Sequence, residues 1–287
     1  MTVDSRRGSA LIESLKRSPY TLHLVPGDPY GSNVINAMNI IFPPGERGFI
    51  RILSQARPLV TDIELQRRID DFVHQESQHA RAHSIVVRQP QHCGKYATWA
   101  KRLTEFFVRF MFGRKNTRSH PLLIFRIGTV AAIEHLTAEL GRWVFEDARF
   151  ADLGCDVRAT ELLKWHAAEE MIHRAVAFDT LAALSPRWHR GVRSSAMLFW
   201  MPVFFCVWML SAQSLMLDDK TVSKRILTPF RVHRSARSGV IPGIPRLVKR
   251  MGSFFRKSFH PDSIVSQETN AACEAYLNIP YVTLKQT

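Results

Sequence analysis

Residues 63–83, IELQRRIDDFVHQESQHARAH, and residues 157–179, VRATELLKWHAAEEMIHRAVAFD, decide the fold class of this chain. In both stretches apolar side chains recur at intervals of three and four residues, which is the spacing of one face of an α-helix. In both, that face continues into a Glu followed three residues later by a His. These Glu-x-x-His pairs are Glu76 with His79, and Glu170 with His173. A helix face that should enter a core therefore carries residues that bind metals.

Two further blocks supply one carboxylate each. Residues 122–145, LLIFRIGTVAAIEHLTAELGRWVF, predict a buried helix with Glu134 on its inward face. Residues 43–53, PPGERGFIRIL, predict a shorter helix that starts after the two prolines and presents Glu46. The pattern Thr61-Asp62-Ile63-Glu64 resembles a capping box at the start of the helix that carries Glu76.

The four blocks together match the ligand set of a dinuclear metal site in a four-helix bundle. Such a site takes one Glu from each of two helices and a Glu-x-x-His pair from each of the other two. The predicted ligands are Glu46, Glu76, His79, Glu134, Glu170 and His173. Carboxylates with imidazoles favour two iron ions, with manganese as the alternative, and the lack of thiolates argues against structural zinc. The alternative is that each pair is a surface contact on a solvated helix.

His166 is a seventh candidate ligand, because it lies one turn before Glu170 on the same face. It would add an imidazole to one metal ion, or it packs beside the site. His83, one turn after His79, is a weaker candidate. Glu169 neighbours a predicted ligand but projects about 100° away from it, so we expect it to support the site or to lie on the surface.

The motifs PPGERGFI, FVHQESQHARAH, IEHLTAEL, WHAAEEMIHRAVAFD and FHP resemble a bacterial family known as predicted metal-dependent hydrolases. The resemblance covers roughly residues 20 to 265. It implies a ferritin-like fold, a bound metal and hydrolase activity. The site pattern is also similar to that of oxygen-activating nonhaem di-iron enzymes, and the added His166 resembles the di-iron N-oxygenases.

Composition and charge indicate the class of protein, its domains and its compartment. The 287 residues, 46% of them hydrophobic, are enough to bury a core without disulfides, and four scattered cysteines indicate no disulfide framework. We predict an all-α protein with a ferritin-like bundle in residues 1–186. Residues 187–287 then form an apolar helical segment and a basic region, packed on the bundle or on a membrane. The N-terminal residues contain no apolar run typical of a secretory signal, which predicts a cytoplasmic protein.

The apolar segment is residues 196–217, AMLFWMPVFFCVWMLSAQSLML, and eleven Lys or Arg follow it in residues 220–257 without an acidic residue. As one helix it would span about 33 Å. Basic residues flank it on both sides, so the positive-inside rule prefers no orientation. We expect a hydrophobic hairpin or re-entrant element at an anionic membrane surface, on the inner face of the cytoplasmic membrane. Packing on the bundle and a full span are the alternatives.

These observations favour an enzyme with two metal ions that oxidises an organic, hydrophobic substrate with dioxygen. The alternatives are a metal-dependent hydrolase that uses an activated water, and a non-catalytic membrane-associated metal-binding protein. A net charge of +14 also admits nucleic acid as a partner, but the basic region lacks a recognition motif. The substrate, the electron donor and homodimer formation are left open by the sequence.

Overall fold

The computed structural model describes residues 6–17 and 21–279. Within these ranges the chain forms helices and no strand, which confirms the all-α prediction. The α-helices are α1 (Arg6–Arg17), α2 (Pro29–Ala56), α3 (Ile63–Val87), α4 (Lys95–Phe112), α5 (His120–Glu146), α6 (Val157–His173), α7 (Val176–Leu184), α8 (His189–Asp218), α9 (Pro229–Arg237), α10 (Ile244–Met251) and α11 (Gln267–Asn278). Short 3₁₀ turns occur at Arg57–Leu59, Pro90–His92, Gly252–Phe255 and Pro261–Ile264.

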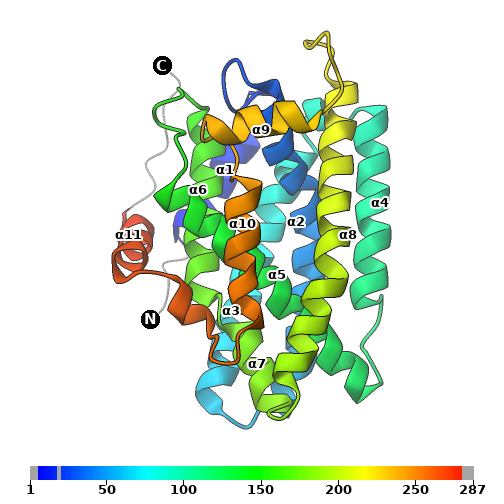
Figure 1. The fold of residues 1–287 in the computed structure, drawn as a ribbon, viewed down its shortest axis with the longest axis vertical. Coiled ribbons are helices and arrows are strands. Elements are labelled where there is room, and N and C mark those ends of the chain that lie inside the picture. The colour runs from blue at the N-terminus through cyan, green and yellow to red at the C-terminus, as the bar shows by residue number, and fades with distance from the viewer. Residues whose placement is uncertain (1–5, 18–20, 280–287) are drawn as a thin grey trace.

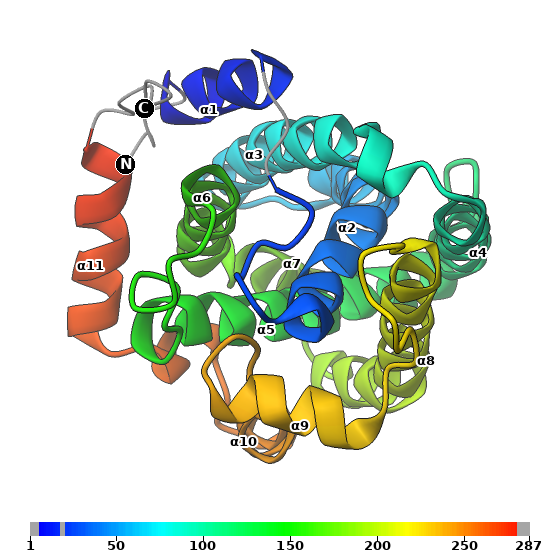
Figure 2. The same ribbon diagram turned by 90° about the horizontal axis from the view of Figure 1, so that it is seen from above.

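Four helices, α2, α3, α5 and α6, surround the centre of the molecule (Figure 2). α2 packs against α3 and α5 packs against α6, while contacts of α3 with α6 and of α2 with α5 close the ring. α4 lies in the crossover between the two pairs and packs on α2 and α8 (Figure 1). This arrangement is consistent with the expected ferritin-like bundle, in which two helical hairpins are joined by a long connection.

Aspartates begin three of the four central helices. Asp28, Asp62 and Asp156 precede α2, α3 and α6, and each carboxylate accepts hydrogen bonds from N–H groups of the first turn. These bonds satisfy donors that have no partner inside the helix. The capping box expected from Thr61 to Glu64 was wrong in register, because Asp62 rather than Thr61 is the N-cap residue.

The helix that carries Glu46 does not start after Pro44. α2 runs unbroken from Pro29 to Ala56 with Pro43 and Pro44 inside it. An interior proline removes a backbone hydrogen bond and costs about 3 kcal/mol, so the local rule predicted a break. Here tertiary packing outweighs that cost, because the turns on both sides of the prolines are anchored in the core. The anchoring side chains are Ile40, Ile41, Phe49 and Ile52.

The apolar segment is one continuous helix, α8, so the expected hairpin is wrong. Pro202 lies on its exposed side, where the carbonyl that Pro202 leaves without a donor can face water. α8 packs against α2, α4 and α5. α5 and α8 are both long and apolar enough to cross a membrane. In the most apolar stretch of each helix, 78% of α5 but only 50% of α8 is buried inside the protein.

Candidate metal centre

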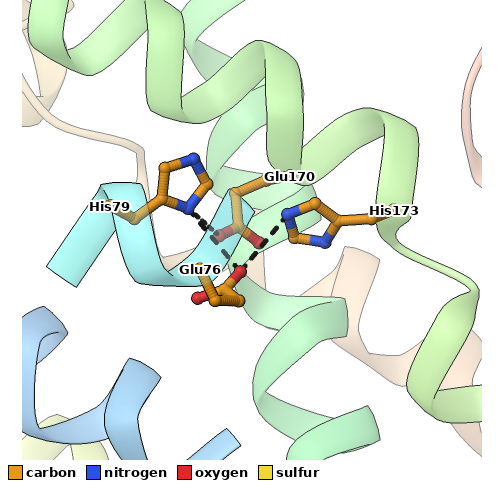
Figure 3. Close-up of side chains that lie close together, drawn as sticks. All are labelled: Glu76, His79, Glu170 and His173. Atoms are coloured by element: carbon orange, nitrogen blue, oxygen red, sulfur yellow. Dashed lines mark ion pairs between the residues drawn. The ribbon is translucent and has the colours of Figure 1, made fainter. Parts of the chain in front are cut away.

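The two Glu-x-x-His pairs meet in the interior of the bundle. Glu76 and His79 come from α3, and Glu170 and His173 come from α6 (Figure 3). One potential ligand atom from each of the four lies within 4.8 Å of the others, and all four side chains are buried. The i,i+3 spacing places each carboxylate and its imidazole on successive turns of one face. The helix faces that the sequence predicted to point inward are therefore the faces that meet.

The remaining predicted residues adjoin this group. Glu46 from α2 and His166 from α6 form a second buried set with His79, again within 4.8 Å of one another. Glu134 from α5 reaches the first set through its Oε2, 3.2 Å from Nδ1 of His173. All seven predicted side chains thus lie in one buried centre to which four helices contribute.

Many atoms in the centre that could bind a metal ion have no hydrogen-bond partner. Glu76 Oε1 lies 3.3 Å from His173 Nε2 and 3.6 Å from His79 Nδ1. Among the described residues, the buried atoms without a hydrogen bond include Glu46 Oε1 and Oε2, Glu76 Oε1 and Oε2, Glu134 Oε1, His79 Nδ1 and His173 Nε2. Leaving one buried polar atom unpaired costs about 1–3 kcal/mol, and more for a charged one. The donor atoms fit bound divalent cations, which would satisfy them together.

His79 is oriented by a carboxylate behind it. Its Nε2 lies 2.8 Å from Oε2 of Glu169, while the other oxygen of Glu169 accepts a 3.0 Å hydrogen bond from the Trp165 indole. With the proton on Nε2, the lone pair of Nδ1 faces Glu76 and Glu170. A carboxylate that holds a histidine in this way is the usual support of a metal-binding imidazole.

His166 is oriented by a chain of hydrogen bonds. Asn39 Oδ1 lies 2.7 Å from Nδ1 of His83, and Nε2 of His83 lies 2.6 Å from Nδ1 of His166. Because the amide oxygen can only accept, His83 donates to Asn39 and accepts from His166. Nε2 of His166 is then unprotonated and lies 2.7 Å from Oε1 of Glu170. Two acceptors at this distance would repel each other, so the arrangement favours a cation or a proton between them.

Charges in the centre shift the acidity of its groups. Burial, reinforced by Glu76, raises the pKa of Glu46 well above its usual value, and burial with Glu170 does the same to the pKa of Glu134. Burial opposes ionisation of Glu170 too, but His173 and His166 outweigh it and lower its pKa to about 2. Burial lowers the pKa of His79, yet the hydrogen bond to Glu169 and the negative charge of the nearby Glu76 raise it well above normal overall. The cluster therefore retains protons where metal ions would otherwise sit.

Sequence reasoning left some supporting residues out or placed them only vaguely. Glu169 lies in the interior, not on the surface, and contacts a ligand candidate from another helix. Asn39 and Thr137 were not singled out, although the Thr137 hydroxyl donates a 2.6 Å hydrogen bond to Glu170 Oε2. Their positions on the inward faces of α2 and α5 were the available signal. His135, beside Glu134, faces away and stacks on Phe254.

Residues 14–264 match the sequence model of a family described as "Predicted metal-dependent hydrolase". No curated protein matches the chain. No solved structure matches it either.

Proposed function

Because the chain belongs to the family of predicted metal-dependent hydrolases, we propose that it hydrolyses a small organic substrate at a dinuclear metal centre. The observation that carries this proposal is the buried Glu and His cluster, whose unpaired donor atoms converge from four helices. Burying four carboxylates without a counter-charge would be severely unfavourable. Retaining such a cluster makes physical sense when cations bind there.

The proposed ligands are the residues with unpaired or converging donor atoms. They are Glu46, Glu76, His79, Glu134, His166, Glu170 and His173. When bound, two divalent ions would lower the pKa of a water and polarise the bond to be cleaved. Hard oxygen donors combined with imidazole favour iron or manganese.

The chain's own residues would position and protect this chemistry. Glu169 holds His79 so that Nδ1 faces the centre, and His83 does the same for Nε2 of His166. Thr137 fixes one oxygen of Glu170 through its hydroxyl. These partners are buried, which limits the access of water to the centre, and a pocket lined by His166 and Glu170 reaches it. Fixed ligands in a shielded site strengthen every electrostatic interaction with a substrate.

Oxidation by dioxygen is the second candidate function, and one observation favours it. The donor set combines four carboxylates with imidazoles from a bundle of four helices, which is the set found in di-iron carboxylate proteins. The family description speaks for hydrolysis instead. The two candidates differ in their need for electrons.

One experiment separates them. The protein is stripped with a chelator, reloaded with Mn²⁺, Zn²⁺ or Fe²⁺, and assayed with p-nitrophenyl esters and phosphoesters without any reductant. We expect metal-dependent cleavage that Glu76→Ala abolishes and that Glu274→Ala, a change on the exposed side of α11, leaves intact. Absence of cleavage, together with oxygen consumption by the anaerobically reduced iron form, would reject hydrolysis in favour of oxidation.

A further inference from the structure

An apolar pocket leads from the surface to the metal centre. It lies between α2, α5, α6 and α8 and is bordered at its outer side by the loop between α9 and α10, through Ile241 and Pro242. Its empty volume is about 590 Å³, including the open mouth. Because this volume includes open solvent, the enclosed part is smaller, which suits a short hydrocarbon chain rather than a polymer.

The inner end of the pocket belongs to the site. His166 and Glu170 both line it, so a molecule in the pocket touches the candidate ligands directly. Phe42 stands beside them, with its ring centre 4.5 Å from that of His166 and 4.9 Å from that of His83. The reacting group of an occupant would therefore lie at this end.

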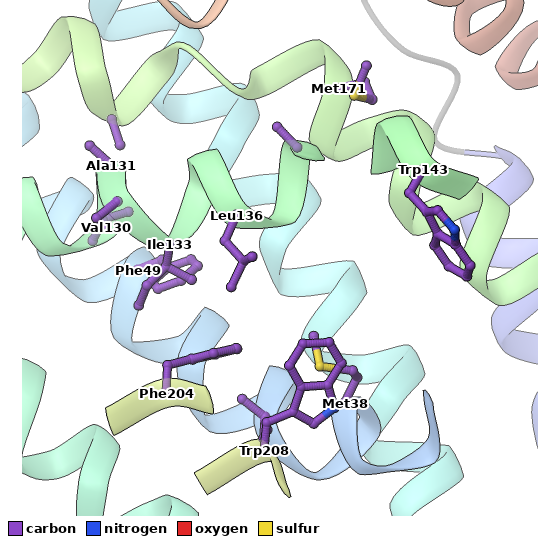
Figure 4. Close-up of a cluster of buried hydrophobic side chains, with 14 of the residues drawn as sticks. Met38, Phe49, Val130, Ala131, Ile133, Leu136, Trp143, Met171, Phe204 and Trp208 are labelled. Atoms are coloured by element: carbon purple, nitrogen blue, oxygen red, sulfur yellow. The ribbon is translucent and has the colours of Figure 1, made fainter. Parts of the chain in front are cut away.

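The walls offer apolar contact. Met38, Trp208 and Trp143 are among the lining side chains (Figure 4), together with Leu163 and Val144. Two polar wall groups are already engaged inside the protein. The indole of Trp208 donates a 2.8 Å hydrogen bond to the carbonyl of Val34, and the hydroxyl of Thr137 donates to Glu170. Affinity for an occupant would thus come mainly from burial of hydrocarbon surface.

The charge of the lining limits the occupant further. None of the described side chains around this pocket is a Lys or an Arg, although the chain carries 39 of them. An anionic group away from the metal end would lose its hydration without gaining a cationic partner. A neutral hydrocarbon part fits these walls better than a phosphorylated or carboxylated one.

From these contacts we propose that the substrate is a neutral carboxylic ester whose hydrocarbon part fills this pocket, an inference that rests on the proposed hydrolase function. The ester group lies at His166 and Glu170. Its hydrolysis breaks the acyl C–O bond, adds the elements of one water, and yields a carboxylic acid and an alcohol. The hydrocarbon part supplies binding energy, while the centre acts on the ester.

Binding can be measured without turnover. The neutral fluorophore N-phenyl-1-naphthylamine is titrated into metal-free protein and then displaced by methyl esters of the four-carbon to eight-carbon straight-chain acids. Each added methylene should tighten binding about fourfold until the pocket is full. With Mn²⁺ bound, the protons of methyl octanoate should relax faster than in metal-free protein, because the ester lies at the centre.

Variants locate the binding site. Val144→Trp places a large ring in the pocket and should weaken binding of both the probe and methyl octanoate at least tenfold. Leu163→Trp blocks the same space from α6 and covers the case in which the first variant fails to fold. Val157→Trp is the matched control, because Val157 is 53% exposed at the start of α6 and does not line the pocket. It should bind like the unmodified protein.

The outcomes distinguish the two proposals. Chain-length-dependent binding that the pocket variants abolish supports the ester proposal, even where metal loading gives no cleavage and the hydrolase function fails. Equal affinity for short and long esters, or equal binding by all three Trp variants, would overturn it. Unchanged proton relaxation in protein that holds Mn²⁺ would overturn it too. Metal-dependent cleavage of phosphoesters alone would overturn the ester proposal while leaving the hydrolase function standing.

Discussion

At the scale of single residues, Glu169 determines which nitrogen of His79 faces the centre. Glu169→Ala should weaken metal binding about 10-fold to 100-fold, because the imidazole loses the acceptor that fixes its tautomer and orientation. Glu169→Gln should cost less, since its amide oxygen can still accept from Nε2. Competition against a chelator of known affinity measures both. Equal affinity in the unmodified protein and Glu169→Ala would show that Glu169 does not orient the ligand.

The sequence predicted which residues gather but not how they support one another. Glu76 with His79 and Glu170 with His173 follow from helical spacing within one element, which needs no tertiary information. The contact of Glu169 with His79 joins α6 to α3 and depends on how these helices pack. Glu169 projects about 100° away from the inward face of its helix, yet it still reaches the centre from the side of that helix.

At the scale of helices, α2 packs closely against α4 at Gly48 but has free space around Gly45. A Cβ at Gly48 would lie 2.5 Å from Cδ2 of Phe112 on α4, whereas a Cβ at Gly45 would have no atom within 4 Å. Gly48→Ala should lower the free energy of unfolding by about 1–3 kcal/mol through overpacking. Gly45→Ala should raise it by about 0.5–1 kcal/mol through helix propensity.

Chemical denaturation of both glycine variants measures the difference. Similar stability for Gly48→Ala and Gly45→Ala would contradict the packing of α4 on α2. Both variants and the unmodified protein should be compared in metal-free form, so that changes in metal binding at the nearby Glu46 do not affect the measured stability.

The errors at the scale of helices have one physical origin. The break at Pro43 and Pro44 was predicted from a local rule about proline. The hairpin in residues 196–217 was predicted from the length of the apolar segment and the basic residues on both of its flanks. In the structure α2 and α8 continue through their prolines because long-range packing holds both flanks. The start of α2 did carry a local signal, Asp28 followed by Pro29, an N-cap residue and a favourable first helical residue.

At the scale of the whole molecule, bound metal should reverse the pH dependence of stability. Glu46 and Glu134 have raised pKa values in the folded metal-free protein, so it holds protons that the unfolded chain releases near pH 4.3. Burial lowers the pKa values of His83 and His166, which oppose this trend until the unfolded chain has released its histidine protons near pH 6.5. The free energy of unfolding should therefore fall as pH rises from about 7 to 9. His79, with its raised pKa, acts in the same direction, and the contribution of Glu170 is already complete above pH 5.

Metal ions replace these protons, and their affinity rises as the ligands lose them. Thermal unfolding with a chelator and with Mn²⁺, at several pH values, should therefore give curves that diverge as pH rises. Curves that stay parallel from about pH 7 to 9 would contradict linkage between the buried carboxylates and metal binding.

We predict that the basic segment, residues 220–257, contacts anionic membranes. It includes exposed apolar side chains, with Phe230 76% exposed and Val248 59% exposed, among Lys and Arg residues. We expect flotation with phosphatidylserine vesicles but not with neutral ones, reversed by high salt because salt screens surface charge. Phe230→Ala should weaken binding to the anionic vesicles, because it removes an apolar side chain from the contact. Equal flotation with neutral and anionic vesicles would contradict an electrostatic contact.

The central claim is that the buried cluster holds two metal ions, and elemental analysis of the reconstituted protein tests it most directly. We predict about two ions of iron or manganese per chain, a clear loss of metal in both Glu170→Ala and His79→Ala, and no loss in Glu274→Ala. A chain that binds almost no metal, or that keeps its full metal content in Glu170→Ala and His79→Ala, would contradict the account.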